Sequence, residues 1–207
     1  DKAVSPLNTY GATKLLMEKL FINANYYKGS RKTKFICVRY GNVLGSRGSI
    51  IPIMVNQIQK NKKITITDPS MTRFNITMKQ AIDLVIRSLK NGIGGEVFIP
   101  KLKTYSLANL RDAVLELMNA DIKIERISVR PGEKYHECLI SADEIRNTYE
   151  TESDYVILDK DIPFVDYSNY PYNKKTELKE SYTSDKTHEL TKEELKNILI
   201  EQKLLPL

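Results

Sequence analysis

A tyrosine and a lysine, Tyr10 and Lys14, stand four residues apart at the start of a segment that we expect to be helical. Four residues rotate about 400° around a helix, so the two side chains lie on one face, one turn apart. A cation beside a phenol favours the phenolate and lowers the pKa of the phenol. Because a phenol tuned in this way can take a proton from a substrate alcohol, the pair predicts acid–base chemistry on a hydroxyl group.

A carboxyl group and an amine, Asp1 and Lys2, are neighbours a few residues before Tyr10. As neighbours, they supply one acid and one base that can reach the same substrate. Taken alone, this pair is better explained as a charged pair in a loop, and the Tyr10–Lys14 pair as a chance pair on the surface. Their interpretation therefore depends on the motifs around them.

The elements that must position these residues alternate between helix and strand. Residues 8–27 are expected to form a helix that ends at Gly29, with an apolar stripe made by Leu15, Leu16, Leu20 and Ala24. A buried strand over 34–39 and a glycine-broken loop follow. Further helices are expected over 50–61, 77–90, 107–119 and 192–203, the last three with N-caps at Thr77, Ser106 and, in a capping box, Thr191. Further strands are expected over 64–67, 96–100 and 122–127.

This alternation predicts an α/β fold with a parallel sheet. In the helix over 77–90 we expect Ala81, Leu84, Val85, Ile86 and Leu89 to face inward. The segment 159–190 is polar and is expected to be an extended arm with little stability of its own.

Charge is unevenly distributed along the 207 residues, whose net charge is +6. Residues 1–140 carry 23 basic and 11 acidic side chains, whereas residues 141–207 carry 9 and 15. A basic body indicates an anionic partner. Nucleic acid is disfavoured because no RNA-binding aromatic signature, zinc-finger spacing or dense Lys/Arg run occurs. A small molecule that carries phosphate is the better candidate.

Other classes of protein are excluded by composition. No apolar run approaches the roughly 18–20 residues that span a bilayer, so no membrane span is expected. Cys37 and Cys138 are expected to be reduced thiols of a cytoplasmic protein, because neither stands in a CxxC motif. With two histidines, no metal site is expected.

Five spaced motifs give the sequence its resemblance to a known family. They are Asp1-Lys2-Ala3 with Tyr10-Gly11-Ala12-Thr13-Lys14, Arg39-Tyr40-Gly41-Asn42-Val43, Gly45-Ser46-Arg47-Gly48-Ser49, Met71-Thr72-Arg73-Phe74, and Arg130-Pro131-Gly132-Glu133-Lys134 before His136-Glu137. In this order they resemble the extended short-chain dehydrogenases/reductases. Within that superfamily they resemble the UDP-N-acetylglucosamine 4,6-dehydratases (C5-inverting) of the polysaccharide-biosynthesis and flagellin-glycosylation group.

The resemblance implies a hydro-lyase that uses bound NADP, or NAD, and leaves the cofactor unchanged. It implies that Tyr10 is the base at the sugar 4-hydroxyl and that Lys14 lowers its pKa and binds the nicotinamide ribose, with Tyr40 also at the cofactor. Lys2 handles the proton at C5, and Asp1 protonates the departing 6-hydroxyl. The better-known deoxyhexose dehydratases have Glu where Lys2 stands, which favours C5 inversion.

The resemblance also implies a site for the UDP-sugar substrate. Asn42 contacts the sugar-nucleotide phosphate, Arg73 and Arg130 bind the pyrophosphate, and Glu133 accepts from the ribose hydroxyls. Guanidinium groups suit this role because they match phosphate oxygens in bidentate fashion. We expect Arg73, Arg130 and Asn42 to converge on one cleft, and we expect Arg39 to be structural.

One departure from the family concerns the cofactor. The sequence has no Gly-rich dinucleotide-binding turn, so we expect an N-terminally truncated fragment of a Rossmann-like sheet with an interleaved smaller substrate domain. We expect residues 1–48 and 71–100 in the NAD(P)-binding part, 49–70 and 101–158 in the substrate domain, and 159–207 as the polar arm and C-terminal helix. A homo-oligomer is expected.

Three alternatives stay open at this stage: a nucleotide-sugar C4-epimerase, a C5-retaining dehydratase on the same scaffold, and an inactive fragment that binds sugar nucleotides.

Overall fold

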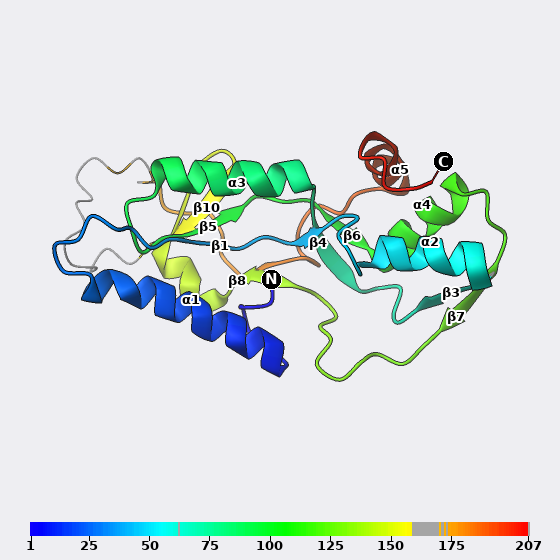
Figure 1. The fold of residues 1–207 in the computed structure, drawn as a ribbon, viewed down its shortest axis with the longest axis horizontal. Helices are drawn as coiled ribbons and strands as arrows, with labels where there is room; N and C mark the ends of the chain where they lie inside the picture. Colours follow the sequence, from blue (N-terminus) through cyan, green and yellow to red (C-terminus); the bar gives the residue numbers. More distant parts are fainter. Residues whose placement is uncertain (62, 159–169, 171, 173, 207) are drawn as a thin grey trace. The chain divides into compact units, whose positions relative to one another are not determined.

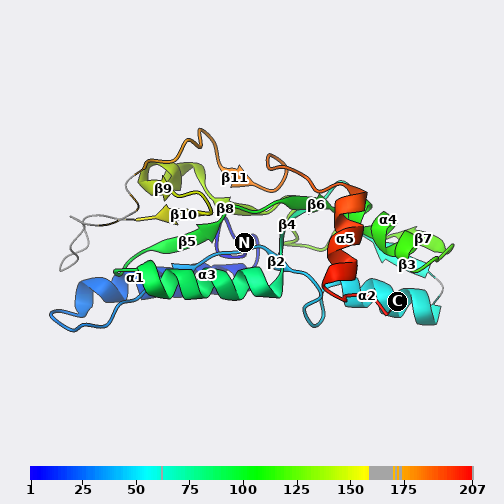
Figure 2. The ribbon, with the colours of Figure 1, turned by 90° about the horizontal axis from the view of Figure 1, so that it is seen from above.

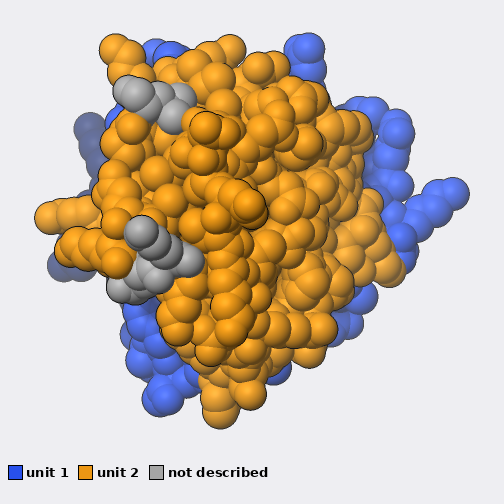
Figure 3. All heavy atoms as spheres, turned by 90° about the vertical axis from the view of Figure 1, so that its right-hand side faces the viewer, with its two compact units in different colours: residues 1–40, 79–101, 138–183 blue, residues 41–78, 102–137, 184–207 orange. Residues whose placement is uncertain are grey.

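The computed structural model describes residues 1–61, 63–158, 170, 172 and 174–206. The chain divides into two compact units, drawn in separate colours in Figure 3. Unit 1 consists of residues 1–40, 79–101 and 138–183, and unit 2 of residues 41–78, 102–137 and 184–207. Each unit is thus assembled from three separate stretches of the chain.

The main sheet of unit 1 has the strand order β1-β5-β10-β9. Strands β1 (Cys37–Val38) and β5 (Val97–Pro100) are parallel, with Cys37 opposite Val97. Strand β10 (Asp154–Ile157) runs antiparallel to both β5 and β9 (Thr148–Glu150), and Figure 2 shows β9 beside β10. The sheet is therefore mixed, with its parallel pair at the β1 edge.

Two helices flank the parallel pair. Helices α1 (Thr9–Tyr27) and α3 (Met78–Asn91) lie on opposite sides of β1 in Figure 1. Unit 1 also contains the 3₁₀ helix η1 (Ala142–Asn147) and a two-stranded pair made by β8 (Cys138–Ile140) and β11 (Tyr182–Thr183). Helix α1 thus reaches the sheet from the face opposite to α3.

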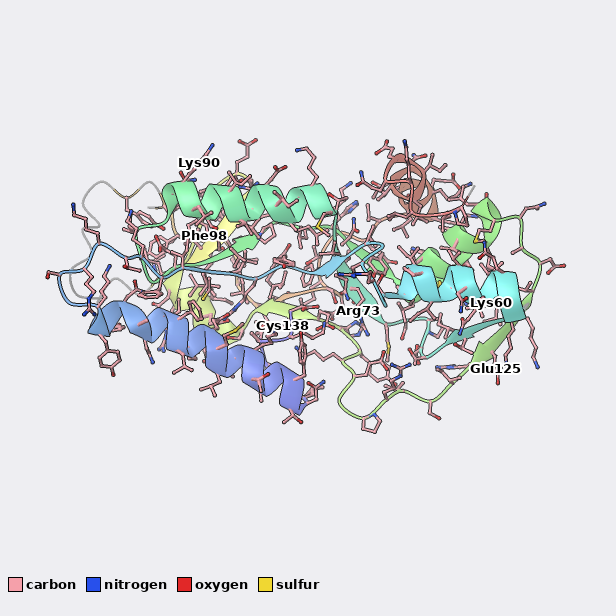
Figure 4. The ribbon with its side chains drawn as sticks, in the orientation of Figure 1. Lys60, Arg73, Lys90, Phe98, Glu125 and Cys138 are labelled. Carbon is pink, nitrogen blue, oxygen red and sulfur yellow. The ribbon has the colours of Figure 1, made fainter. Side chains whose placement is uncertain are left out.

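The core of unit 1 is built on the fully buried Phe98 of β5, which is labelled in Figure 4. Leu84, Tyr149, Val156 and Leu158 belong to the same cluster, with Tyr170 and Tyr172. The ring of Tyr172 meets that of Phe98 edge to face at 5.6 Å between centroids. Two residues of the segment expected to be a weakly stabilised arm therefore pack in the core. Most of the arm's first part, residues 159–169, lies outside the described residues.

Unit 2 contains a three-stranded sheet of order β2-β4-β6 and a parallel pair of strands. The strands of the sheet are β2 (Asn42–Val43), β4 (Thr72–Ile76) and β6 (Thr104–Ser106), and the pair is β3 (Lys63–Ile66) with β7 (Lys123–Arg126). Helices α2 (Ile50–Asn61), α4 (Leu107–Leu117) and α5 (Lys192–Glu201) complete it. Its core includes the fully buried Ile51, Ile64 and Leu110.

The helix ends follow the expected capping residues. Ser106 accepts a hydrogen bond from the Asn109 amide at the start of α4, at 3.2 Å. Thr191 and Glu194 form a capping box at the start of α5. Because these side chains satisfy amides that have no partner within the helix, they fix where each helix begins.

The expected apolar stripe of α1 and the expected inward face of α3 are each wrong in part. In α1, Leu16 and Leu20 are each 59% exposed, and the buried residues are Gly11, Glu18 and Asn25. In α3, Ala81 and Leu84 are buried as expected, but Val85, Ile86 and Leu89 are exposed. Apolar content therefore does not identify the buried face of α1, because its buried contacts to the described residues are polar.

The α/β fold class with a parallel strand pair is confirmed. The compact units divide the chain at residues other than the expected domain boundaries. Residues 138–158 fall in unit 1 because β10 pairs with β5, and residues 71–78 fall in unit 2 because β4 pairs with β2 and β6. Which part binds cofactor and which binds substrate stays a prediction. No helix within the described ranges has the length and apolar composition needed to cross a bilayer.

Candidate functional site

A cavity of about 460 Å³ in unit 1 gathers five of the residues singled out from the sequence. It lies along α1 and β1 and is lined by Asp1, Lys2, Tyr10, Lys14 and Tyr40, together with Glu18, Cys37 and Arg39. Residues from the N-terminal segment, the helix and the strand thus meet at one place.

The start of α1 sets the position of Tyr10 and Lys14. The Asn8 side chain caps the helix by accepting from the Gly11 amide at 2.9 Å. One turn apart, the Lys14 ammonium lies 5.4 Å from the centroid of the Tyr10 ring, which is within the range of a cation–π contact. The side chain of Tyr10 is 61% exposed. The phenol is therefore open to an incoming group and has a cation beside it.

Asp1 and Lys2 are held close to the same helix. The Lys2 ammonium lies 2.6 Å from the Asp1 carboxylate, and the Asp1 nitrogen donates to the Tyr40 carbonyl at 3.3 Å. Gly11 permits this approach, because a Cβ at that position would lie 2.8 Å from the Lys2 carbonyl oxygen. An acid and an amine thus line the cavity that contains the phenol.

The lining of this cavity also contains a buried ion pair and a thiol. Arg39 donates to both oxygens of Glu18, at 2.7 and 2.6 Å. Burial, followed by the negative charge of Glu18, raises the pKa of the Cys37 thiol to about 11. Cys37 is therefore a protonated, weakly reactive group at neutral pH.

A second cavity, of about 240 Å³, lies within unit 2. Asn42, Arg73, Arg130 and Glu133 all line it. The two arginines, although 57 positions apart in the sequence, therefore lie around one cavity with Asn42, as expected.

Two polar atoms at this second cavity have no hydrogen-bond partner among the described residues. They are Asn42 Oδ1 and Ser49 Oγ, both buried. A buried polar atom without a partner costs about 1–3 kcal/mol, so such a pair indicates a place where a ligand or water completes the bonding. Ser49 was missed as a site residue, although it ends one of the five motifs.

The two arginines differ in how firmly they are held. Arg73, labelled in Figure 4, is 8% exposed and donates to the carbonyls of Thr72 and Tyr135 at 2.8 and 3.0 Å. Its guanidinium also lies 3.6 Å from Glu133 and 3.8 Å from Glu137. Arg130 is exposed, and its amide donates to Glu133 at 3.2 Å. Arg73 is thus fixed before any ligand arrives, whereas the Arg130 side chain can move.

Within the part of the chain that the structure describes, no group of three or more His, Cys, Asp or Glu side chains is arranged to hold a metal ion.

Comparisons with known proteins find relatives over most of the chain. The family model described as "Polysaccharide biosynthesis protein" matches residues 1–159. A UDP-glucose 4-epimerase of Rickettsia rickettsii is 39% identical over 97% of this chain and 59% of its own length. An inverting UDP-N-acetylglucosamine 4,6-dehydratase of Campylobacter jejuni is 44% identical over 76% of this chain and 46% of its own length.

A solved structure agrees over a similar extent. The X-ray structure of Pen from Bacillus thuringiensis is 43% identical, with a TM-score of 0.88 over 98% of this chain and 60% of that one. The chain thus spans less than two thirds of the length of each of these three relatives.

Proposed function

Because the chain belongs to the polysaccharide biosynthesis family of extended short-chain dehydrogenases/reductases, we propose that it carries the catalytic and substrate-binding residues of a UDP-N-acetylglucosamine 4,6-dehydratase that inverts C5. Its relatives include both such a dehydratase and epimerases that act at C4. The observation that carries the proposal is the cavity that brings together the acid, the amine and the phenol of Asp1, Lys2 and Tyr10.

The residues at this cavity fit the nicotinamide end of a nicotinamide cofactor, which is the end that takes part in the reaction. Lys14 and Tyr10 stand on one helix face, and Tyr40 lines the same cavity. We propose NADP as the cofactor, with NAD as the alternative; when bound, it supplies a hydride acceptor and donor for the sugar. The Gly-rich turn for its diphosphate is not among the 207 residues, so these groups account for one end of the cofactor only.

The side chains of this chain then divide the proton transfers among them. Tyr10 takes the proton from the 4-hydroxyl, and Lys14 stabilises the phenolate. A ketone at C4 acidifies the neighbouring C–H bond at C5, so Lys2 in its neutral form can remove that proton. Asp1 in its protonated form gives a proton to the 6-hydroxyl, which leaves as water. Lys2 releases this proton to solvent, and C5 takes a proton from solvent on its opposite face, which inverts that centre.

The second cavity supports binding of the UDP moiety. Arg73 and Arg130 each offer a guanidinium to the diphosphate, and Glu133 offers a carboxylate to ribose hydroxyls. The unpartnered Asn42 Oδ1 lies in the same lining and requires a donor. A cytoplasmic homo-oligomer stays part of the proposal.

Lys2→Ala in the full-length enzyme tests the assignment of roles. We expect loss of dehydration with survival of hydride transfer at C4, seen as cofactor absorbance at 340 nm and no loss of water by mass spectrometry. Tyr10→Phe should stop both steps. Normal dehydration by Lys2→Ala would show that Lys2 is not the C5 base and would weaken the inverting assignment.

The epimerase alternative has a distinct product. An epimerase would interconvert UDP-N-acetylglucosamine and its C4 epimer without any loss of water. NMR spectra of the products therefore separate the two activities, and an unchanged substrate in the presence of both cofactors would favour the inactive-fragment alternative.

A further inference from the structure

Helix α1 carries Tyr10 and Lys14 but buries little apolar surface against the described residues. Its three buried positions are Gly11, Glu18 and Asn25, which recur every seven residues. The apolar side chains of Leu16 and Leu20 point to solvent. The most buried side-chain contacts of this helix are therefore polar, and they are accompanied by an edge-to-face contact of Phe21 with Phe35 at 6.2 Å between ring centroids.

Glu18 makes the strongest of these contacts. Arg39, which directly follows β1, donates from Nε to Glu18 Oε2 at 2.7 Å and from Nη2 to Oε1 at 2.6 Å. The side chains of Arg39 and Glu18 are 3% and 7% exposed. A bidentate pair of this kind fixes direction as well as distance, since both planar groups must align.

The same guanidinium is held on its other side by the C-terminal part of unit 1. Arg39 donates to both oxygens of Glu144 in η1, at 3.0 and 2.6 Å, and to the Leu139 carbonyl at 2.9 Å. Burial opposes ionisation of Glu144, but the hydrogen bond and charge of Arg39 outweigh it and lower the pKa of Glu144. Glu144 is therefore ionised at neutral pH and pairs with the Arg39 guanidinium.

Glu18 and the reactive residues share one face of the helix. Lys14 and Tyr10 precede Glu18 by four and eight residues, so their directions differ from that of Glu18 by about 40° and 80°. All three line the same cavity with Arg39. Any rotation of α1 that moves Glu18 away from Arg39 also turns Tyr10 and Lys14.

We propose that the cluster of Glu18, Arg39 and Glu144 positions Tyr10 and Lys14 for proton transfer by fixing the rotation of α1 about its axis. The inference rests on the proposed function in that Tyr10 must be the base. The three members are positioning residues, because none of them is required to touch the substrate. Their loss should slow the chemical step and leave the affinity for the UDP moiety unchanged, since that is bound by residues of unit 2.

A matched ion pair elsewhere in unit 1 provides the control. Arg87 of α3 donates to both oxygens of Asp154, at 2.9 and 2.7 Å, and this pair does not involve α1. Arg39→Lys and Arg87→Lys both replace a bidentate guanidinium by an ammonium, which cannot form two parallel bonds. Because the Arg87 side chain is 36% exposed and that of Arg39 is 3% exposed, the free energy of unfolding of both variants is measured beside their kinetics.

The kinetic test compares these variants in the full-length enzyme. We expect Arg39→Lys and Glu18→Gln to lower kcat about tenfold or more with KM for UDP-N-acetylglucosamine within about twofold, because small errors of orientation are costly in catalysis. Arg87→Lys should keep kcat within about twofold. An equal fall in kcat in Arg39→Lys and Arg87→Lys, or unchanged kcat in Glu18→Gln, would overturn the positioning role.

A second measurement separates this inference from the proposed function. In the 207-residue chain with Cys37 and Cys138 replaced by serine, a thiol is introduced as Lys14→Cys or as Leu16→Cys. Alkylation of the thiol should be faster at position 16, because Leu16 is 59% exposed in the parent chain. Adding Arg39→Lys should make the difference between the two alkylation rates smaller. Unchanged rates in Arg39→Lys would refute the inference even if the enzyme is a dehydratase. A smaller rate difference in Arg39→Lys, together with no dehydratase activity of the full-length enzyme, would support the positioning of α1 and refute the proposed function.

Discussion

The side chain of Asn25 binds both backbone groups of Phe35. Its Nδ2 donates to the Phe35 carbonyl at 2.9 Å, and its Oδ1 accepts from the Phe35 amide at 3.2 Å. Nδ2 also donates to the Ile22 carbonyl at 3.0 Å within α1. An amide side chain thus pairs with the chain as a neighbouring strand would, and it ties the end of α1 to the segment that leads into β1.

Asn25→Ala should lower the free energy of unfolding by about 1–3 kcal/mol, because it leaves the Phe35 amide without its partner. The Phe35 carbonyl keeps the bond from the Gly95 amide at 2.8 Å. Urea unfolding followed by circular dichroism measures this change. Asn23→Ala is the control, since Asn23 is an exposed residue of the same helix. Equal losses for Asn23→Ala and Asn25→Ala would show that helix propensity, and not the contact with Phe35, is responsible.

Arg130→Ala should weaken binding of UDP to the 207-residue chain about tenfold to a hundredfold, since one charge-assisted contact is lost. It should leave the urea midpoint unchanged because the side chain of Arg130 is exposed. Isothermal titration calorimetry measures the affinity. Lys123→Ala, which removes the same charge from the exposed β7, serves as the control. Equal affinities for UDP in the two variants would contradict the assignment of Arg130 to the diphosphate.

Glu144→Gln should make the free energy of unfolding fall less steeply as the pH is lowered into the acid range. The pKa of Glu144 in the folded chain is lowered despite burial, because Arg39 stabilises the carboxylate. The contribution of this ionised group is therefore fully present above the unfolded pKa of about 4.3 and is lost as the pH falls through the lower folded pKa.

Urea unfolding at several pH values checks this sign. The parent chain should exceed Glu144→Gln in unfolding free energy at pH 7, by about 1–2 kcal/mol. The gap should shrink below pH 4. A gap that stays constant from pH 7 to pH 3 would mean that ionisation of Glu144 does not contribute.

Cys37 should be nearly inert to iodoacetamide at pH 8 in the Cys138→Ser chain, although it lines a cavity. Burial and then Glu18 raise the pKa of its thiol to about 11, so the reactive thiolate is rare. The rate should rise about tenfold per pH unit up to that value. The same chain in urea, where a thiol has a pKa of about 8.5, should react at once at pH 8, and fast labelling of the folded chain would refute the expectation.

Local signals in the sequence were sufficient for where α4 and α5 begin, although each helix ends two residues earlier than expected. Thr191 and Ser106 cap helices as expected, because a cap depends on residues within a few positions. Strand β4 was not expected, since all five of its residues are buried and three of them, Thr72, Arg73 and Asn75, are polar. No alternation of apolar and polar residues marks such a strand.

The residues of the candidate site that lie in sequence motifs could be predicted. The contacts that those residues make with distant parts of the chain could not. Tyr10 and Lys14 are placed by helix periodicity alone. The partner of Glu18 is 21 positions away, and Glu144 lies 105 positions from Arg39, so neither contact leaves a local pattern. Buried polar contacts of this kind depend on the tertiary structure.

The seven-residue recurrence of Gly11, Glu18 and Asn25 bears on the order in which the chain folds. Apolar side chains stabilise a partly folded chain even when they are loosely packed. A buried ion pair or amide contact stabilises it only once both partners are in place. We therefore expect helix α1 to dock late, after the segment from Phe35 to Arg39 has paired with β5 through the bonds of Cys37 and Arg39. In refolding with pulsed hydrogen exchange, amides of β5 should gain protection before those that hold α1 against the sheet.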